Sequence, residues 1–248
     1  MNKDIKAVIT AVSDDGQKAS WVLADIGGKP LIQQIFESAA QAGVDQVVIA
    51  TDSPRIGMVC EDFGATVCML VDEKYHGLER LAEVADRMGW GDQDILVNVP
   101  VDAPLIPKEV IKQVASNLVN NEDADGAILF TLVTREAALL TDSINMVVDN
   151  SSYVMYLSHH AIPHIDHQPT GDIQYKQYLG LSAYSVGLLR AINSMSAEQV
   201  DVVEGIDELK LLYNGMKIHA EEASRKVGFR VHNDDDLEVL KQQLATLA

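Results

Sequence analysis

The chain has 248 residues, of which 47% are hydrophobic and 23% charged, and its formal net charge is −18. This size and composition predict a soluble globular protein with one large core, or with a main domain and a smaller companion. Nucleic acids and anionic membranes are bound through clusters of Lys and Arg, so the acidic excess argues against both kinds of partner. Any phosphate site must gather some of only 19 Lys and Arg residues.

The cysteines and the N-terminal residues indicate that the protein is located in the cytoplasm. Cys60 and Cys68 lie in apolar segments without the spacing of metal ligands, which is typical of buried thiols in a reducing environment. The first residues are not followed by an apolar run of signal-peptide length, and no apolar stretch approaches the roughly 20 residues of a membrane span. We therefore expect a cytoplasmic protein with no membrane partner.

The first half of the chain alternates strand-like and helix-like segments. Apolar runs predict strands at 7–12, 46–50, 65–69 and 95–99, and one-sided apolar patterns predict helices at 30–42, 53–63, 79–88 and 107–118. Strands that alternate with helices in this way favour a doubly wound parallel sheet with right-handed crossovers.

The second half has a different pattern. Strands are predicted at 127–133, 146–149 and 153–157, and the last two have no helix between them, which indicates a hairpin that turns at 149–152. A loop is expected at 159–172, strands at 178–184 and 217–220, and helices at 186–192, 207–214 and 234–247. The predicted fold class is α/β, a doubly wound, mostly parallel sheet with an inserted antiparallel β element. One domain is expected to span 1–248, with the insertion at about 140–185.

Asp102 is the first candidate for a functional residue. It follows the buried strand at 95–99 and Pro100, which ends the pairing of that strand. Open α/β sheets bind ligands at the carboxyl ends of their strands, and a carboxylate there commonly holds a hydrated divalent cation that a phosphate shares. The same spacing also suits a turn residue at the start of the next helix. Both interpretations remain open.

A second candidate is the segment 159–167, which contains four His residues and one Asp. Imidazole is a good ligand for zinc or nickel, and a metal site here would indicate a sensor or a scavenger. Pro163 prevents one continuous helix from presenting His160 and His164 as a pair. The alternative is a polar loop at a dimer edge.

Short motifs in order through nearly the whole chain resemble those of the 3-deoxy-manno-octulosonate cytidylyltransferases, also called CMP-Kdo synthetases. They are Gly28-Lys29-Pro30-Leu31-Ile32, Ala50-Thr51-Asp52, Glu79-Arg80-Leu81-Ala82-Glu83-Val84, Val97-Asn98-Val99 with Asp102 and Pro104, and Tyr213 with Gly215 and Lys217-Ile218-His219. The resemblance implies a nucleotide-diphosphosugar-transferase type of α/β fold with a dimerising β insertion. It also implies an enzyme that uses CTP and Mg²⁺ to join CMP to an acidic octulosonate sugar, with release of pyrophosphate, for lipopolysaccharide synthesis.

The same resemblance assigns site residues. It places the nucleotide against Ala11, Lys18, Gly77 and Arg80, the Mg²⁺ ion on Asp102, and the sugar near Tyr184, Glu204 and Asp207. The same resemblance implies that the chain pairs with a second copy of itself in a homodimer.

The loop after the first strand departs from the family pattern. Family members carry Ala-Arg-Tyr-x-Ser-x-Arg-x-Pro-Gly-Lys-Pro there, and cytidylyl transfer needs such bases and metal ions around the triphosphate. Aligned without gaps, the two Arg positions become Val12 and Gln17 and the Lys becomes Trp21. Lys18 is the base that remains, and a solvated loop lysine is its alternative role.

Other departures follow downstream. Pro100 replaces the Gln that reads cytosine, and Ser158-His159 and Gln177-Tyr178 replace Ser-Arg and Arg-His pairs of the sugar pocket. The second metal-binding acid of the family falls on His232, whereas Asp234 and Asp235 are predicted to cap the last helix. Most of these changes remove positive charge, so the sequence predicts a retained scaffold with an altered site.

Two functions therefore remain open. The first is a divergent cytidylyltransferase that uses Asp102 for Mg²⁺ and Arg80 and Lys18 for the phosphates. The second is a catalytically inactive relative that binds a sugar, a nucleotide or a protein partner.

Overall fold

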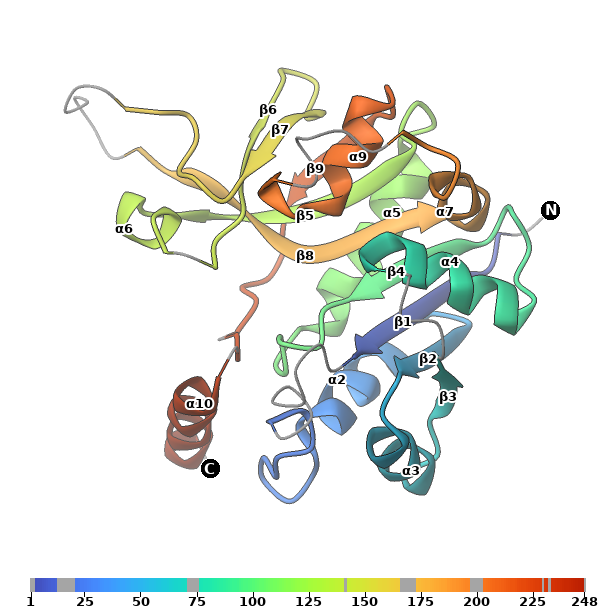
Figure 1. Cartoon of the computed structure of the whole chain (residues 1–248). Coiled ribbons are helices and arrows are strands. Elements are labelled where there is room, and N and C mark those ends of the chain that lie inside the picture. Colours follow the sequence, from blue (N-terminus) through green and yellow to red (C-terminus); the bar gives the residue numbers. More distant parts are fainter. Residues whose placement is uncertain are drawn as a thin grey trace.

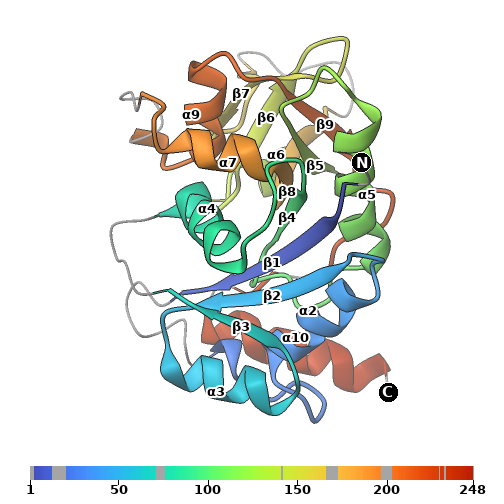
Figure 2. The same ribbon diagram turned by 90° about the vertical axis from the view of Figure 1, so that its right-hand side faces the viewer.

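The computed structural model of the chain describes residues 3–12, 21–70, 76–140, 142–165, 173–196, 203–228, 230–231 and 233–247. In this part of the chain the strands form one nine-stranded mixed sheet, in which the main order is β3-β2-β1-β4-β8-β5-β9. Helices cover both of its faces (Figure 1 and Figure 2).

The N-terminal half forms the parallel part of this sheet. Its strands are β1 (Ile5–Ala11), β2 (Gln46–Thr51), β3 (Thr66–Met69) and β4 (Ile95–Val99), and its helices are α2 (Leu31–Ala40), α3 (Pro54–Asp62), α4 (Gly77–Met88) and α5 (Lys108–Asn120). The pairs β1–β2, β2–β3 and β1–β4 are all parallel. Ser53 caps α3 by accepting a hydrogen bond from the Ile56 N–H, and Gly89 ends α4 in the left-handed conformation.

The C-terminal half adds the antiparallel part. It contains β5 (Gly126–Val133), α6 (Arg135–Ala138), β6 (Asn145–Val148), β7 (Val154–Ser158), β8 (Tyr175–Ser185), α7 (Val186–Ile192), α9 (Asp207–Tyr213), β9 (Ile218–Glu222) and α10 (Asp234–Leu247). Strand β8 lies between β4 and β5 and is antiparallel to both. Strands β6 and β7 form the predicted hairpin, which joins the sheet through β8.

Two hydrophobic layers hold the helices on the sheet. One layer joins alternate strand residues such as Ile9 and Val97 to α2, α3, α5 and α10, and the other joins Val8 and Leu96 to α4, α7 and α9. This alternation is the period of two that a strand buried on both faces requires. The arrangement leaves the carboxyl ends of β1 and β4 side by side at one edge (Figure 2).

The predicted fold class, a mostly parallel α/β sheet with an antiparallel insertion, is confirmed, and the predicted elements occur within a few residues of their expected bounds. The parallel sheet predicted from the first half is confirmed for β1 to β4, and β8 then joins β4 and β5 in the opposite direction. The short helix α6 was not predicted. Of the expected loop at 159–172, residues 159–165 contain no helix or strand, and 166–172 lie outside the described residues.

Both cysteines are buried free thiols, as predicted. Burial raises the pKa of the Cys60 thiol to about 12, so the group stays protonated and unreactive. Among the described residues, none of the helices is long and apolar enough to cross a membrane.

Candidate functional site

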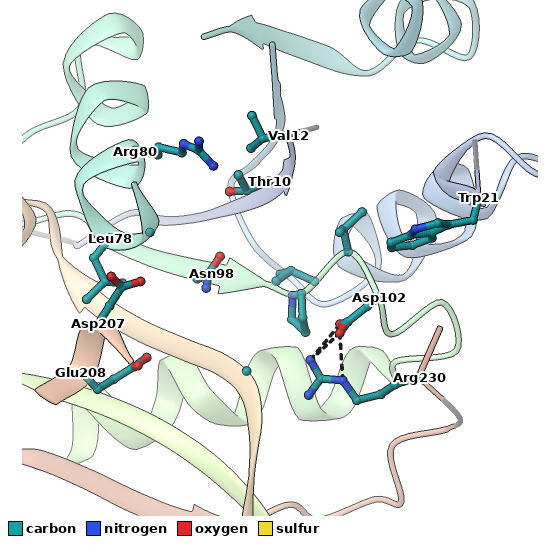
Figure 3. A pocket seen from close by; sticks show the side chains of 15 residues that line it. Thr10, Val12, Trp21, Leu78, Arg80, Asn98, Asp102, Asp207, Glu208 and Arg230 are labelled. Carbon is teal, nitrogen blue, oxygen red and sulfur yellow. Dashed lines mark hydrogen bonds and ion pairs between the residues drawn. The ribbon is translucent and has the colours of Figure 1, made fainter. Parts of the chain in front are cut away.

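A cavity of about 380 Å³ opens where β1 and β4 end. It is lined by Thr10, Val12, Trp21, Gly77, Leu78, Arg80, Asn98, Val99, Pro100, Val101, Asp102, Gly180, Asp207, Glu208 and Arg230. These residues come from both halves of the chain and from both faces of the sheet (Figure 3). The carboxyl edge of a parallel sheet is where open α/β folds bind ligands.

An ion pair between Asp102 and Arg230 forms one wall of the cavity. The Arg230 Nη2 atom donates to Asp102 Oδ1 at 2.9 Å and to Oδ2 at 2.7 Å, and Nε donates to Oδ2 at 3.1 Å. The backbone N–H of Val231, which is fully buried, also donates to the carbonyl oxygen of Asp102 at 2.8 Å. The side chain of Arg230 is therefore anchored by its neighbour in the core.

Gly180 makes room for this guanidinium group. In the β5–β8 pairing, Ile128 lies opposite Ser182 and Phe130 opposite Tyr178, so β8 advances four residues while β5 advances two. Gly180 lies in the middle of this bulge with φ +68°, and a Cβ atom on it would lie 3.2 Å from Arg230 Nη2. Bulges of this kind often re-aim a strand beside a site.

The opposite wall is acidic. Asp207 and Glu208 begin α9 and lie across Asn98 from the Asp102–Arg230 pair (Figure 3). The hydroxyl groups of Tyr178 and Tyr184 donate to Glu208 Oε1 at 2.6 and 3.1 Å. Burial and the adjacent Glu208 carboxylate raise the pKa of both phenols well above its usual value, so both remain donors.

Asp207 lies over the first residues of α4. It accepts a hydrogen bond from the backbone N–H of Leu78, where the helix dipole favours an anion. Burial, and then repulsion by Glu208, nevertheless raise the pKa of Asp207 from 3.8 to about 7. A cavity residue that is partly protonated near neutral pH is a candidate for proton transfer.

The structure brings four of the residues assigned by resemblance to the cavity, namely Gly77, Arg80, Asp102 and Asp207. Tyr184 lies beneath the cavity and contacts it through Glu208. Their roles in binding stay predictions. The possibility that Asp102 caps the next helix is wrong, because α5 begins at Lys108 after Pro107.

Ala11 and Glu204, which the resemblance also assigned, are not among the residues that line the cavity. Ala11 is buried in β1 between two lining residues. Glu204 accepts hydrogen bonds from the Ser158 hydroxyl at 2.7 Å and from the His159 N–H at 3.0 Å, and it is not among the residues that line the cavity. Lys18 lies outside the described residues.

Sequence reasoning missed Arg230, Glu208 and Gly180. Arg230 directly precedes Val231-His232, the position where the resemblance places a second metal-binding acid, and this was the one available signal. Glu208 follows Asp207, yet the spacing alone does not show that two tyrosines hold it in the cavity.

The described residues do not fit a divalent metal ion at Asp102. Both carboxylate oxygens already accept hydrogen bonds from Arg230, and a guanidinium group repels a second cation. The chain described here contains no group of three or more His, Cys, Asp or Glu residues arranged to hold a metal. His159, His160 and His164 of the predicted histidine site are part of this search, whereas His167 and His232 lie outside the described residues.

Comparison with known proteins agrees with this geometry. A family model described as cytidylyltransferase matches residues 21–218. A 3-deoxy-manno-octulosonate cytidylyltransferase of Haemophilus influenzae (strain 86-028NP) is 34% identical over 232 residues, which cover 90% of this chain and 91% of the relative. A protein of the same name from Coxiella burnetii (strain Dugway 5J108-111) is 35% identical over 242 residues, which cover 95% and 97%.

This chain belongs to the 3-deoxy-manno-octulosonate cytidylyltransferase family. A solved CMP:2-keto-3-deoxy-manno-octonic acid synthetase complexed with CTP superimposes with a TM-score of 0.89 at 25% identity, over 99% of this chain and all of that one. The predicted resemblance is therefore confirmed. In this chain the Arg230 side chain pairs with Asp102 at 2.7 Å.

Replacing Gly77 by Ala should destabilise the protein by about 2–4 kcal/mol, because the new Cβ has no room and φ there is positive. A Cβ at Gly77 would clash with the Asp207 carboxylate. Gly89→Ala at the other end of α4 is the matched control, since its Cβ would meet none of the described atoms within 4 Å. Its expected cost is about 1 kcal/mol. Urea unfolding measures both, and equal costs would contradict the close packing of Asp207 on Gly77.

Replacing Asp207 by Asn should flatten the pH dependence of stability. Between its unfolded value of 3.8 and its folded value of about 7, Asp207 binds more proton in the folded chain, so the free energy of unfolding falls as pH rises. From about pH 5 to about pH 7.5, the variant should lose about 1 kcal/mol less than the wild type, because the exposure of Asp207 to solvent screens part of the effect. Asp62→Asn, which removes an exposed carboxylate from α3, is the control. Parallel curves for Asp207→Asn and the wild type would refute the raised pKa.

Proposed function

We propose that this chain is a cytidylyltransferase that joins the CMP part of CTP to 3-deoxy-manno-octulosonate or a related acidic sugar. The observation that carries the proposal is the cavity at the ends of β1 and β4, which gathers Arg80 and Arg230 in a chain that is otherwise acidic. The named relatives and the CTP complex of the structural neighbour supply the substrate class.

The reaction sets clear demands on the cavity. A sugar hydroxyl oxygen bonds to the α-phosphorus of CTP, the bond from that phosphorus to the bridging oxygen breaks, and pyrophosphate leaves. Guanidinium groups stabilise the negative charge that develops on the leaving group. The hydroxyl proton needs an acceptor, and Asp207, with a pKa of about 7, has the proton affinity for this role near neutral pH.

The family resemblance also suggests Mg²⁺ as a cofactor and Asp102 as its ligand. The proposal assigns no step to a metal ion, because the Asp102 carboxylate is engaged by Arg230.

A cytoplasmic location is part of the proposal, since nucleotide sugars for such a reaction are made from cytoplasmic CTP.

A homodimer formed through the inserted elements is a further part of the proposal. Leu139 and Leu140, at the end of α6, and Met155, on β7, each expose more than 60% of their surface. Exposed apolar patches are typical of surfaces that bind another protein chain.

Calorimetry with CTP, followed by a pyrophosphate-release assay with 3-deoxy-manno-octulosonate, tests the activity. The wild type should bind CTP and release pyrophosphate only when the sugar is present. Arg80→Ala should weaken CTP binding by about 10-fold or more, because one charged hydrogen bond is lost. Arg135→Ala, an exposed arginine of α6, is the control and should bind like the wild type. CTP binding without pyrophosphate release would favour the inactive relative instead.

Sedimentation velocity tests the dimer. The wild type is expected to sediment as a dimer, and Met155→Glu should shift it toward the monomer because a charge on an apolar contact surface resists burial. Met58→Glu is the control, since Met58 is similarly exposed on α3. A monomeric wild type would exclude the dimer.

A further inference from the structure

The guanidinium group of Arg230 is a fixed cation on the wall of the cavity. Its described hydrogen bonds use Nε and Nη2, and both go to the Asp102 carboxylate. The two N–H groups of Nη1 take part in none of the described hydrogen bonds. A guanidinium group donates hydrogen bonds from a rigid planar fork, so these two N–H groups are available in a fixed geometry.

Several contacts hold this cation in one place. Arg230 lies next to the fully buried Val231, whose N–H donates to the Asp102 carbonyl oxygen. Gly180 leaves space beside Nη2, and Gly228 lets the same segment approach Leu105, where an added Cβ would come within 2.9 Å. Gly180 on β8 and Gly228 before Arg230 therefore let this segment pack closely, which fits a positioned guanidinium group.

The pair answers the demands that a metal ion otherwise meets. A divalent cation on an aspartate needs free carboxylate oxygens and brings positive charge to the phosphates. Here Arg230 bonds to both oxygens of Asp102 in a pair that is neutral overall, and the N–H groups of Nη1 supply the hydrogen-bond donors for an anion. Arginine is also well suited to phosphate, because its planar fork donates parallel hydrogen bonds.

We propose that Arg230 takes the place of a divalent metal ion in this site, so that the phosphates of a nucleoside triphosphate bind to it without Mg²⁺. The inference rests on the proposed function, because it assumes that the cavity receives a triphosphate. It goes beyond that function by naming the cation that receives the phosphates and by removing the need for a metal.

Calorimetry tests the inference with two probes, CTP and inorganic triphosphate. The binding of each probe is measured once in millimolar Mg²⁺ and once in EDTA. The affinity of the wild type for each probe should differ by less than about 3-fold between the two buffers, because the positive charge is part of the chain. Arg230→Gln should weaken binding in EDTA by about 10-fold or more, and Arg230→Lys, which keeps the charge but loses the fork, should lie between. Arg225→Gln, an exposed arginine of the same segment, is the control. Circular dichroism checks that each variant is folded.

The outcomes separate this inference from the proposed function. Binding that requires Mg²⁺, or wild-type affinity in folded Arg230→Gln, overturns the role of Arg230 and leaves cytidylyl transfer intact. Metal-free binding of inorganic triphosphate that depends on Arg230, with no binding of CTP, supports the role of Arg230 and overturns the proposed function. Absence of binding by both probes in both buffers overturns both. The wild-type comparison between buffers is decisive even if the variants fail to fold.

Discussion

The carboxylate of Asp102 sits at the point where the sheet meets its cavity, and its oxygens are committed to Arg230. This pair joins the turn after β4 to the segment that follows β9, two parts of the chain that are 128 residues apart. The side chains of Asp102 and Arg230 are only 17% and 31% exposed, so water screens their attraction less than it would at the surface. At this edge of the cavity the negative charge of Asp102 is therefore neutralised by Arg230.

The remainder of the cavity has the opposite character. Asp207 and Glu208 are held by backbone and phenol donors rather than by cations, and burial keeps the pKa of Asp207 near 7. The cavity thus has Arg230 on one wall and Asp207 and Glu208 on the other, with Arg80 on α4, the helix over which Asp207 lies (Figure 3). The acidic wall changes charge close to neutral pH because the pKa of Asp207 is about 7. An anionic ligand meets less repulsion when Asp207 is protonated. The difference in charge between the two walls of the cavity therefore depends on pH as well as on residue type.

Much of the fold was predictable because its signals are local. Hydrophobic runs, the Ser53 cap and the glycines that end helices determine where elements begin and end, and the family motifs identified the topology. The direction of β8 was not predictable from its pattern alone, since a strand buried on both faces reads the same in either direction. Within the cavity, motifs identified Gly77, Arg80, Asp102 and Asp207 as candidates. The pairing of Asp102 with Arg230 and of Glu208 with two tyrosines depends on tertiary contacts, which no spacing in the sequence encodes.

The bulge at Gly180 has a consequence for how such sheets diverge. Across it, β8 contains two residues more than the facing stretch of β5, and the ladder is regular on both sides. A two-residue deletion would restore continuous pairing without changing which face any later side chain occupies, because the side-chain period of a strand is two. Such a deletion would remove Gly180 with one of the two core leucines, Leu179 or Leu181, and with them the hollow beside Arg230. Length variation in one central strand is therefore a route by which relatives with the same architecture gain or lose an arginine at this position.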